Sequence, residues 1–223
     1  MTRVQQLGPR AQRTRRAILA AAEGIFAEKG FAAARLEDVA AQVEIRRASL
    51  VYYFRDKRAL YEAVLHELLG ELLVRYQAVI DGPGDMPEKL EKILVVWLRY
   101  LGERPALSRI ILREAAESSP VSAVLADGLR PLVKAILDVV LEGQRRKQFD
   151  PVDPIRFVLT IAGSTIFYDI FAQLLNTSPP RDPEAVDIPA GHTEVLRILR
   201  RLVGARSLRA VPSSSPGGRR RLT

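Results

Sequence analysis

The sequence contains no cysteine and only two histidines, His66 and His192, in 223 residues. Without thiols there can be neither a disulfide framework nor a thiolate zinc site, and two imidazoles are too few for a histidine metal cluster. A glycine-rich phosphate loop is also absent, and no acid–base constellation can be named. We therefore expect no metal, no cofactor and no enzymatic activity, with an all-helical enzyme as the minor alternative.

Long apolar runs are missing as well. No stretch approaches 18 uncharged apolar residues, and the first residues reach no apolar run before Ala17. The first absence argues against a membrane span, and the second argues against a signal peptide. We expect a cytoplasmic protein with no membrane partner.

Alternation of apolar and polar residues with period two, the pattern of strands, is not found in any segment. Apolar residues instead recur at three- and four-residue spacing between proline- and glycine-rich breaks at residues 81–87, 149–154 and 176–191. With 48% apolar residues the chain can bury a sizeable core. The sequence predicts an all-α fold of about nine helices, the last near residues 193–203.

The net charge of +8 is distributed unevenly along the chain. Residues 1–60 hold 12 Lys or Arg against 6 acids, residues 61–196 hold 14 against 20, and residues 197–223 hold 8 against none. A basic head and tail around an acidic middle favour contact between the ends and a polyanion. A solvated basic tail without a partner, or a protein that coats DNA without sequence choice, is compatible with the same pattern.

Residues 36–60, LEDVAAQVEIRRASLVYYFRDKRAL, are the most informative stretch. They contain two short amphipathic segments on either side of a tight connection at about residues 42–46. The predicted buried positions are Leu36, Val39, Ala40 and Val43 in the first segment and Ile45, Ser49, Leu50 and Phe54 in the second. Two helices this short must pack on a neighbour, and such a pair is typical of helix-turn-helix proteins that insert a helix into the major groove.

A longer helix is predicted in front of this pair, from Arg13 to Lys29. It carries an apolar stripe from Ile18 to Phe26, and Gly30 follows where a left-handed C-terminal cap is needed. Residues 13–56 therefore form a compact three-helix unit, and residues 1–12 are expected to be a mobile basic arm. The arginines at the front of this unit are placed to meet phosphates: Arg10, Arg13, Arg15 and Arg16.

The stretch ILAAAEGIFAEKGFAAARLEDVAAQVEIRRASLVYYFRDKRALYEAVL resembles the DNA-binding domain of the TetR family of bacterial transcriptional regulators. The likeness covers the helix stripe, the glycine after it, the helix pair, the closing aromatic run and the lysine. It implies a helix-turn-helix domain over residues 13–56 and a helical ligand-binding and dimerisation domain over residues 57–205. Residues 206–223, rich in Ser, Gly, Pro and Arg, are expected to be a disordered basic tail.

The resemblance also implies roles for individual residues. Base edges are expected to meet Arg47, Ala48 and Ser49, and phosphates are expected to meet the remaining residues, with Arg46 able to do either. The full set of predicted DNA contacts is Arg46, Arg47, Ala48, Ser49, Tyr52, Tyr53 and Lys57. A buried core aromatic is the alternative for Tyr53.

Four positions depart from the family pattern. Ala34 stands where a Thr usually caps the second helix, Glu44 where a Gly usually makes the turn, and Arg46 where a Ser usually caps the reading helix. Val51 replaces a usual Tyr. Since a side-chain N-cap is worth on the order of 1 kcal/mol, the head is expected to rely on packing.

The segment 155–175 is apolar nearly all round, so one partner cannot cover it. We expect a homodimer, with a central core helix as the alternative. Small residues in mid-helix would allow close approach, and the last helix would complete the interface. The predicted interface is Phe157, Ile161, Gly163, Ser164, Leu196 and Leu199.

The helices between residues 88 and 175 are expected to enclose an effector pocket. Its predicted lining is Trp97, Tyr100, Arg113, Phe157, Phe167 and Tyr168, which favours a small apolar ligand. With the resemblance, this predicts a repressor that leaves a palindromic DNA operator when the ligand binds. A non-specific architectural DNA-binding protein is the alternative.

Overall fold

The computed structural model describes residues 8–117, 121–174 and Arg197, and these residues form helices without any strand. The predicted all-α fold is confirmed. The eight helices are α1 (Pro9–Ala33), α2 (Leu36–Gln42), α3 (Arg47–Tyr53), α4 (Lys57–Asp81), α5 (Met86–Glu103), α6 (Pro105–Glu117), α7 (Ser122–Arg145) and α8 (Pro154–Leu174). Of the helix predicted near residues 193–203 only Arg197 is described, and the predicted tail at 206–223 lies outside the described residues.

Helix α1 begins four residues earlier than the sequence pattern predicts. Gly8 is its N-cap and Pro9 its first residue, so residues 9–12 are helical and not part of an arm. Proline at the first helical position fits because its fixed φ suits a helix and its missing N–H would be unpaired there. The apolar stripe starts only at Ile18, which is why periodicity gave no signal for this turn.

Gly30 has a positive φ of 75°, which favours glycine, but its ψ of 171° lies outside the left-handed helical region of the predicted cap. The regular helix is interrupted there, and the chain makes one further turn before Ala34, which ends the element in extended conformation. Phe31 then stacks on Phe26 with ring centroids 6.3 Å apart and meets Tyr61 of α4 edge-on at 5.2 Å. The glycine thus lets this aromatic group tie α1 to α4.

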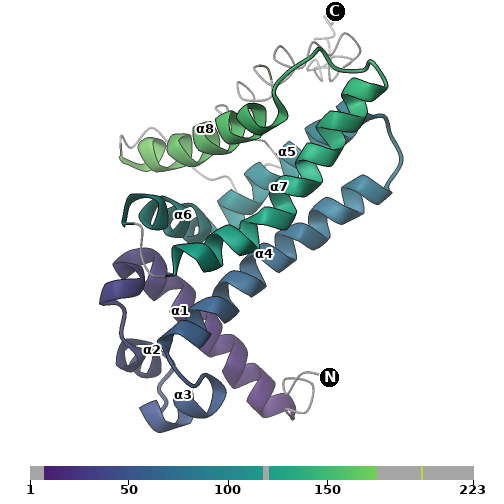
Figure 1. Ribbon diagram of the computed structural model, residues 1–223. Helices are drawn as coiled ribbons and strands as arrows, with labels where there is room; N and C mark the ends of the chain where they lie inside the picture. Colours follow the sequence, from purple (N-terminus) through teal and green to yellow (C-terminus); the bar gives the residue numbers. More distant parts are fainter. Residues whose placement is uncertain (1–7, 118–120, 175–196, 198–223) are drawn as a thin grey trace, which may run out of the picture.

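Helix α4 connects the two parts of the molecule. It begins with Asp56 as N-cap, whose carboxylate accepts from the backbone N–H of Ala59 at 2.7 Å. Its inner face is buried from Leu60 to Tyr76, and it packs on α1, α5 and α7. Figure 1 shows α4 running from the α2–α3 end of the molecule into the layer formed with α5 and α7.

Helices α5 to α8 form the second part of the molecule. Helix α7 stays continuous through Pro131, and α8 lies at the end of the molecule opposite to α2 and α3 (Figure 1). Among the described residues, no helix is long and apolar enough to span a membrane. The same residues contain no cluster of His, Asp or Glu side chains that could hold a metal ion.

Candidate functional site

The connection between α2 and α3 is as tight as predicted. Helix α2 ends at Gln42 and α3 begins at Arg47, and the backbone N–H of Ile45 donates to the carbonyl of Ala40 at 2.9 Å. Glu44 adopts a positive φ of 57°, a conformation that usually requires glycine. The turn expected from the helix-turn-helix pattern is therefore present, and it places a non-glycine residue in an unfavourable backbone region.

Helix caps in this region lack side-chain support. The N-cap of α3 is Arg46, as expected, and it makes no side-chain cap hydrogen bond. The N-cap of α2 is Arg35 and not Ala34, and it also lacks such a bond. Ala34 instead ends α1. Packing holds both short helices, since Val39, Leu50 and Phe54 are buried.

The outer face of α3 carries most of the predicted DNA contacts. Its first turn exposes a basic and small surface, and Tyr52 is 74% exposed one turn further on. Ser49, which the periodicity grouped with the buried positions, lies on this exposed face. The exposed members of the predicted set are Arg46, Arg47, Ala48, Ser49 and Tyr52.

Tyr53 and Lys57 are half-buried. The ring of Tyr53 lies edge-on to that of Tyr52, with centroids 5.4 Å apart. The ammonium of Lys57 donates to the carbonyl oxygens of Ala32 at 2.9 Å and Ala34 at 3.0 Å. It also lies 4.6 Å from the centroid of the Phe31 ring. Lys57 therefore fastens the end of α1 to the start of α4, and one of its three N–H donors remains for a phosphate.

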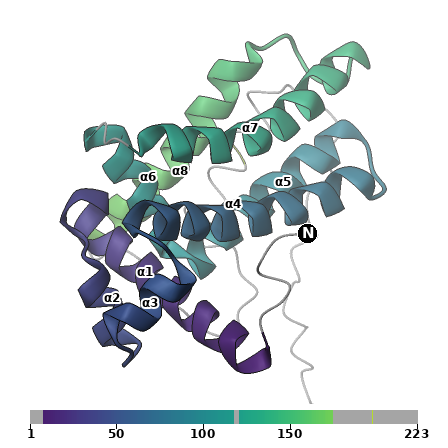
Figure 2. The same cartoon turned by 60° about the horizontal axis from the view of Figure 1, so that its bottom comes forward.

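Acidic and basic side chains approach α3 from its neighbours. The Nε of Arg47 lies 2.9 Å from the carboxylate of Glu37 on α2, and both side chains are more than half exposed. The guanidinium of Arg15 on α1 lies 5.3 Å from the centroid of the Phe54 ring. The N-terminal half of α1, which lies beside α3 in Figure 2, thus adds positive charge next to the reading helix.

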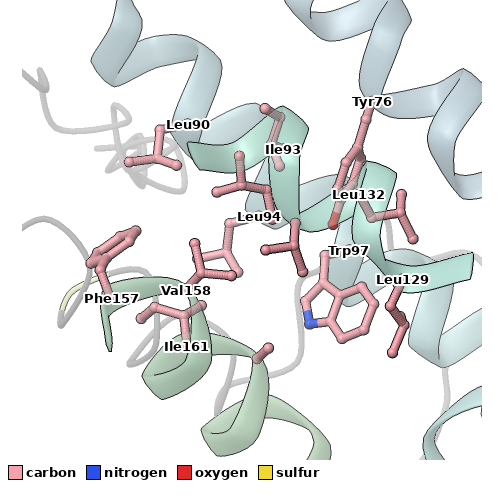
Figure 3. A pocket seen from close by; sticks show the side chains of 13 residues that line it. Tyr76, Leu90, Ile93, Leu94, Trp97, Leu129, Leu132, Phe157, Val158 and Ile161 are labelled. Atoms are coloured by element: carbon pink, nitrogen blue, oxygen red, sulfur yellow. The ribbon is translucent and has the colours of Figure 1, made fainter. Parts of the chain in front are cut away.

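An apolar cavity of about 80 Å³ lies in the second part of the molecule, between α4, α5, α7 and α8 (Figure 3). None of the described residues that line it is charged. The lining consists of Tyr76, Leu90, Ile93, Leu94, Trp97, Leu129, Leu132, Val133, Ile136, Phe157, Val158, Ile161 and Ala162. Of the predicted pocket residues, Trp97 and Phe157 are therefore brought together here.

The other four predicted pocket residues lie elsewhere. Tyr100 is buried, but its hydroxyl donates to the carbonyl of Leu68 at 2.7 Å on the α4 side. Arg113 donates to backbone carbonyls of α1, while Phe167 and Tyr168 are exposed on α8. They do not line this cavity, because the phase of each helix, and not its composition, decides which side chains face inward.

Sequence reasoning also missed Tyr76, because the pocket was sought only between residues 88 and 175. The tyrosine lies on α4, outside that range. A single Tyr in the apolar stripe of a long helix carries no signal that separates a cavity from a packed core. Burial raises the pKa of its hydroxyl, since ionisation would place a charge in the apolar interior.

Helix α8 presents two different apolar faces. Phe157 and Ile161, predicted at a dimer interface, point into the cavity and are only 6% and 8% exposed. Gly163 and Ser164 are exposed, as an interface position requires, and Leu196 and Leu199 lie outside the described residues. The outward face is strongly apolar, with exposed Ile155, Leu159, Phe167, Tyr168 and Phe171.

Polar contacts tie the head to α5 and α6. Arg113 donates to the carbonyls of Ala27 and Glu28 near the end of α1. Arg104 pairs with Glu23 of α1 at 2.7 Å, and burial raises the pKa of that carboxyl despite the nearby guanidinium. These contacts connect the second part of the molecule directly to α1.

A buried carboxylate extends this connection. Glu114 of α6 is 6% exposed and accepts from the hydroxyl of Tyr61 at 3.1 Å and from Ser122 Oγ at 2.8 Å. Burial and the adjacent carboxylate raise the pKa of Tyr61. The network joins α4, α6 and the start of α7 behind the reading head.

Known proteins resemble this chain in sequence and in fold. Residues 18–64 match the family described as bacterial regulatory proteins, tetR family. The HTH-type transcriptional regulator RutR of Escherichia coli K12 is 29% identical over 162 residues, which span 71% of this chain and 74% of RutR.

Two solved structures have the same arrangement of helices. The fatty acid degradation regulator FadR from Bacillus halodurans has a TM-score of 0.69 at 17% identity, covering 87% of this chain and 99% of that one. FadR from Bacillus subtilis, solved with stearoyl-CoA, has a TM-score of 0.68 at 18% identity and covers 82% and 96%.

The fold and the exposed α3 thus define a helix-turn-helix transcriptional regulator. The chain is similar to the TetR family of bacterial regulatory proteins, whose family model matches residues 18–64.

Proposed function

We propose that the protein is a sequence-specific repressor that binds a palindromic operator as a homodimer and is released by a small apolar ligand. The observation that carries the proposal is the exposed first turn of α3, where Arg46 and Arg47 stand beside the small Ala48 and Ser49. Small side chains let a helix approach base edges closely, and arginine can pair with guanine through two donors.

The division of roles follows exposure. Arg47, Ala48 and Ser49 read base edges, and the exposed Tyr52 contacts phosphate. Tyr53 supports Tyr52 through its ring, and Lys57 adds its remaining donor to the backbone while holding α1 in place. Phosphate contacts position the head and carry no sequence information of their own.

The domain division predicted from the sequence remains our proposal. Residues 13–56 serve as the DNA-binding unit, with residues 9–12 added at the front of α1. Residues 57–205 serve ligand binding and dimerisation. Helix α4 belongs to both in practice, since it packs on α1 as well as on α5 and α7.

The outward face of α8 is the proposed dimer surface. Leu159 and Phe167 are 63% and 54% exposed, and an apolar face of this kind is covered in stable oligomers. A twofold axis there would place two copies of α3 on two half-sites. Helix-turn-helix dimers bind half-sites about 34 Å apart, which is why a palindrome is the expected operator.

The cavity between α4, α5, α7 and α8 is the proposed effector site. It is apolar and without charge among its described lining residues, which favours an apolar ligand. The acyl-CoA of the Bacillus subtilis FadR structure is a much larger and charged molecule, so it is not the ligand proposed for a cavity of this size. Ligand binding is proposed to act on the head through α4 and through the α1–α6 contacts of Arg113.

The test uses labelled duplex DNA from immediately upstream of the protein's own coding region. Fluorescence anisotropy of the full chain is measured against that duplex in a large excess of random duplex, at a fixed salt concentration. Binding that survives the competitor and is lost in Arg47→Ala supports a sequence-specific regulator.

Equal competition by random duplex at every concentration contradicts sequence-specific binding and favours an architectural protein, whose affinity comes from phosphates alone. Addition of apolar compounds to the preformed complex then separates the repressor from a regulator without an effector. Release by none of them contradicts the ligand-responsive part of the proposal.

A further inference from the structure

Polar chemistry within the cavity is confined to two side chains. Among its described lining residues, only Tyr76 and Trp97 carry a polar side-chain atom. The indole N–H of Trp97 donates to Thr165 Oγ1 at 2.8 Å, and that hydroxyl bonds in turn to backbone carbonyls of α8. The Trp97 donor is therefore already satisfied.

Tyr76 is different, because it is buried to 2% exposure while its hydroxyl bonds to no described residue. Figure 3 shows its hydroxyl end directed among the lining side chains, near Trp97 and Leu132. Its oxygen is not one of the fully enclosed unpaired atoms of the described residues, which are Arg104 Nε and Ser108 Oγ, so it borders the space of the cavity and can bond to a molecule held there. Burial raises the pKa of this hydroxyl, so the O–H stays protonated near neutral pH.

Water is a poor partner for this hydroxyl. A buried water is held by two to four polar groups, and the cavity offers a single free one on its described lining. A molecule with an apolar body can fill the remaining walls, which are aliphatic or aromatic, and present one oxygen to Tyr76. An anion is disfavoured because no described lining residue is a cation that could offset its desolvation.

We propose that the cavity binds a neutral, mainly apolar molecule with one hydroxyl or carbonyl oxygen, which is hydrogen-bonded by the Tyr76 hydroxyl. The inference rests on the proposed effector role of this cavity and specifies the chemical class of the effector. The Tyr76 hydroxyl selects a ligand that carries an oxygen, and the apolar walls select the shape of the ligand.

The size of the cavity limits the ligand and connects it to the head. An engineered cavity of about 150 Å³ holds one benzene, so about 80 Å³ suits at most a single ring, with some outward movement of the lining helices. Tyr76 lies about 28 Å along α4 from Lys57, on the helix that packs against α1. A ligand bonded to Tyr76 therefore acts on the helix that supports the reading head.

The experiment measures binding of three matched probes to the full chain by titration calorimetry. The probes are phenol, toluene and benzoate, which share a single ring and carry a hydroxyl, a methyl and a carboxylate. We expect the phenol to bind about three- to tenfold more tightly than the hydrocarbon, the range for one neutral hydrogen bond. The carboxylate should bind weakest.

Tyr76→Phe removes only the hydroxyl and should abolish the preference for the phenol. Tyr100→Phe is the matched control, since its hydroxyl is bonded to Leu68 outside the cavity and its loss should leave the preference intact. Thermal melting gives a second readout: Tyr76→Phe should melt at or above the temperature of the parent, and Tyr100→Phe below it.

Several results would overturn the inference: an unchanged preference in Tyr76→Phe, tightest binding of the carboxylate, no measurable binding of any probe, or a clear loss of melting temperature in Tyr76→Phe. The operator assay keeps the two proposals apart. Tyr76-dependent binding without release of DNA supports the site and contradicts the effector role. If a compound releases DNA and binds the parent and Tyr76→Phe equally well, the effector role is supported and this inference is overturned.

Discussion

The Nε of Arg47 lies 2.9 Å from the carboxylate of Glu37, so the main candidate for base reading is paired with an acid of α2 in the absence of DNA. Both side chains are largely exposed, and such pairs are weak. DNA can therefore compete for Arg47, at the cost of leaving a negative charge near the phosphates.

Glu37→Gln is expected to tighten binding to all duplexes by about two- to fivefold, because it removes that repulsion and frees Arg47. Asp38→Asn is the matched control. Asp38 also lies on α2, but it pairs with Lys29 at 2.8 Å. Anisotropy titrations at one salt concentration compare the two, and a larger gain for Asp38→Asn would contradict the role given to Glu37.

Arg47→Ala should relax base preference, losing about 1 to 3 kcal/mol of discrimination at one position. Lys57→Ala should weaken all duplexes by a similar factor. A panel of single base substitutions in the operator measures both. Equal loss of discrimination in the two variants would be inconsistent with the division between base and phosphate contacts.

Lys57→Ala should also lower the free energy of unfolding by about 1 kcal/mol, since it removes the hydrogen bonds to Ala32 and Ala34. Denaturant unfolding measures this directly. An unchanged unfolding free energy would show that the ammonium is free in solution and not fixed at the end of α1.

Glu44→Gly is expected to stabilise the protein by about 0.5 to 1 kcal/mol, because glycine tolerates the positive φ of this turn. Lys147→Gly relieves a similar φ of 56° after α7 and should stabilise to a similar extent. The two differ in place: only Glu44→Gly should also strengthen DNA binding, as it removes a negative charge beside α3. Destabilisation by either glycine would refute the strain assigned to that turn.

Leu159→Arg should raise the dimer dissociation constant about 30-fold or more, the change for losing a central contact worth about 2 kcal/mol. Val74→Arg is the control, since Val74 is 70% exposed on α4 and lies outside the proposed interface. Analytical ultracentrifugation distinguishes them. Dissociation by Val74→Arg, or an intact dimer in Leu159→Arg, would move the interface away from α8.

The pH dependence of the unfolding free energy should show the raised pKa of the Glu23 carboxyl. Burial raises its pKa in the folded state above the ordinary value of 4.5. Between these two pKa values the folded chain binds more protons than the unfolded chain, so this contribution to the unfolding free energy falls as pH rises. Relative to Glu23→Gln, the parent protein should lose stability from pH 4.5 upward, and a relative gain would contradict the raised pKa.

The reading head could be predicted well because its signals are local. The apolar stripe from Ile18 to Phe26 and the positive φ at Gly30 depend on residues close to each other along the chain. The start of helix α1 at Pro9 was missed, because a proline can occupy the first turn of a helix as readily as it can interrupt a helix. Only the surrounding backbone decides between the two.

Helix α8 shows what a sequence pattern leaves open. A helix that is apolar on both sides has no polar stripe to fix its rotation, so Phe157 and Leu159 were equivalent in the sequence. The structure turns the first into the cavity and the second outward. The role of Tyr76 was similarly hidden, because the absence of a hydrogen-bond partner is a property of its tertiary surroundings.

Selection of DNA sites from a random duplex pool by the full chain tests the central proposal most directly, because the pool samples every candidate operator sequence at once. The proposal predicts enrichment of an inverted repeat whose half-site centres are about one helical turn or a whole number of turns apart. Arg47→Ala should lose the preferred base at one symmetric pair of positions. A pool that remains random after repeated rounds, while total binding stays strong, would contradict sequence-specific recognition by α3.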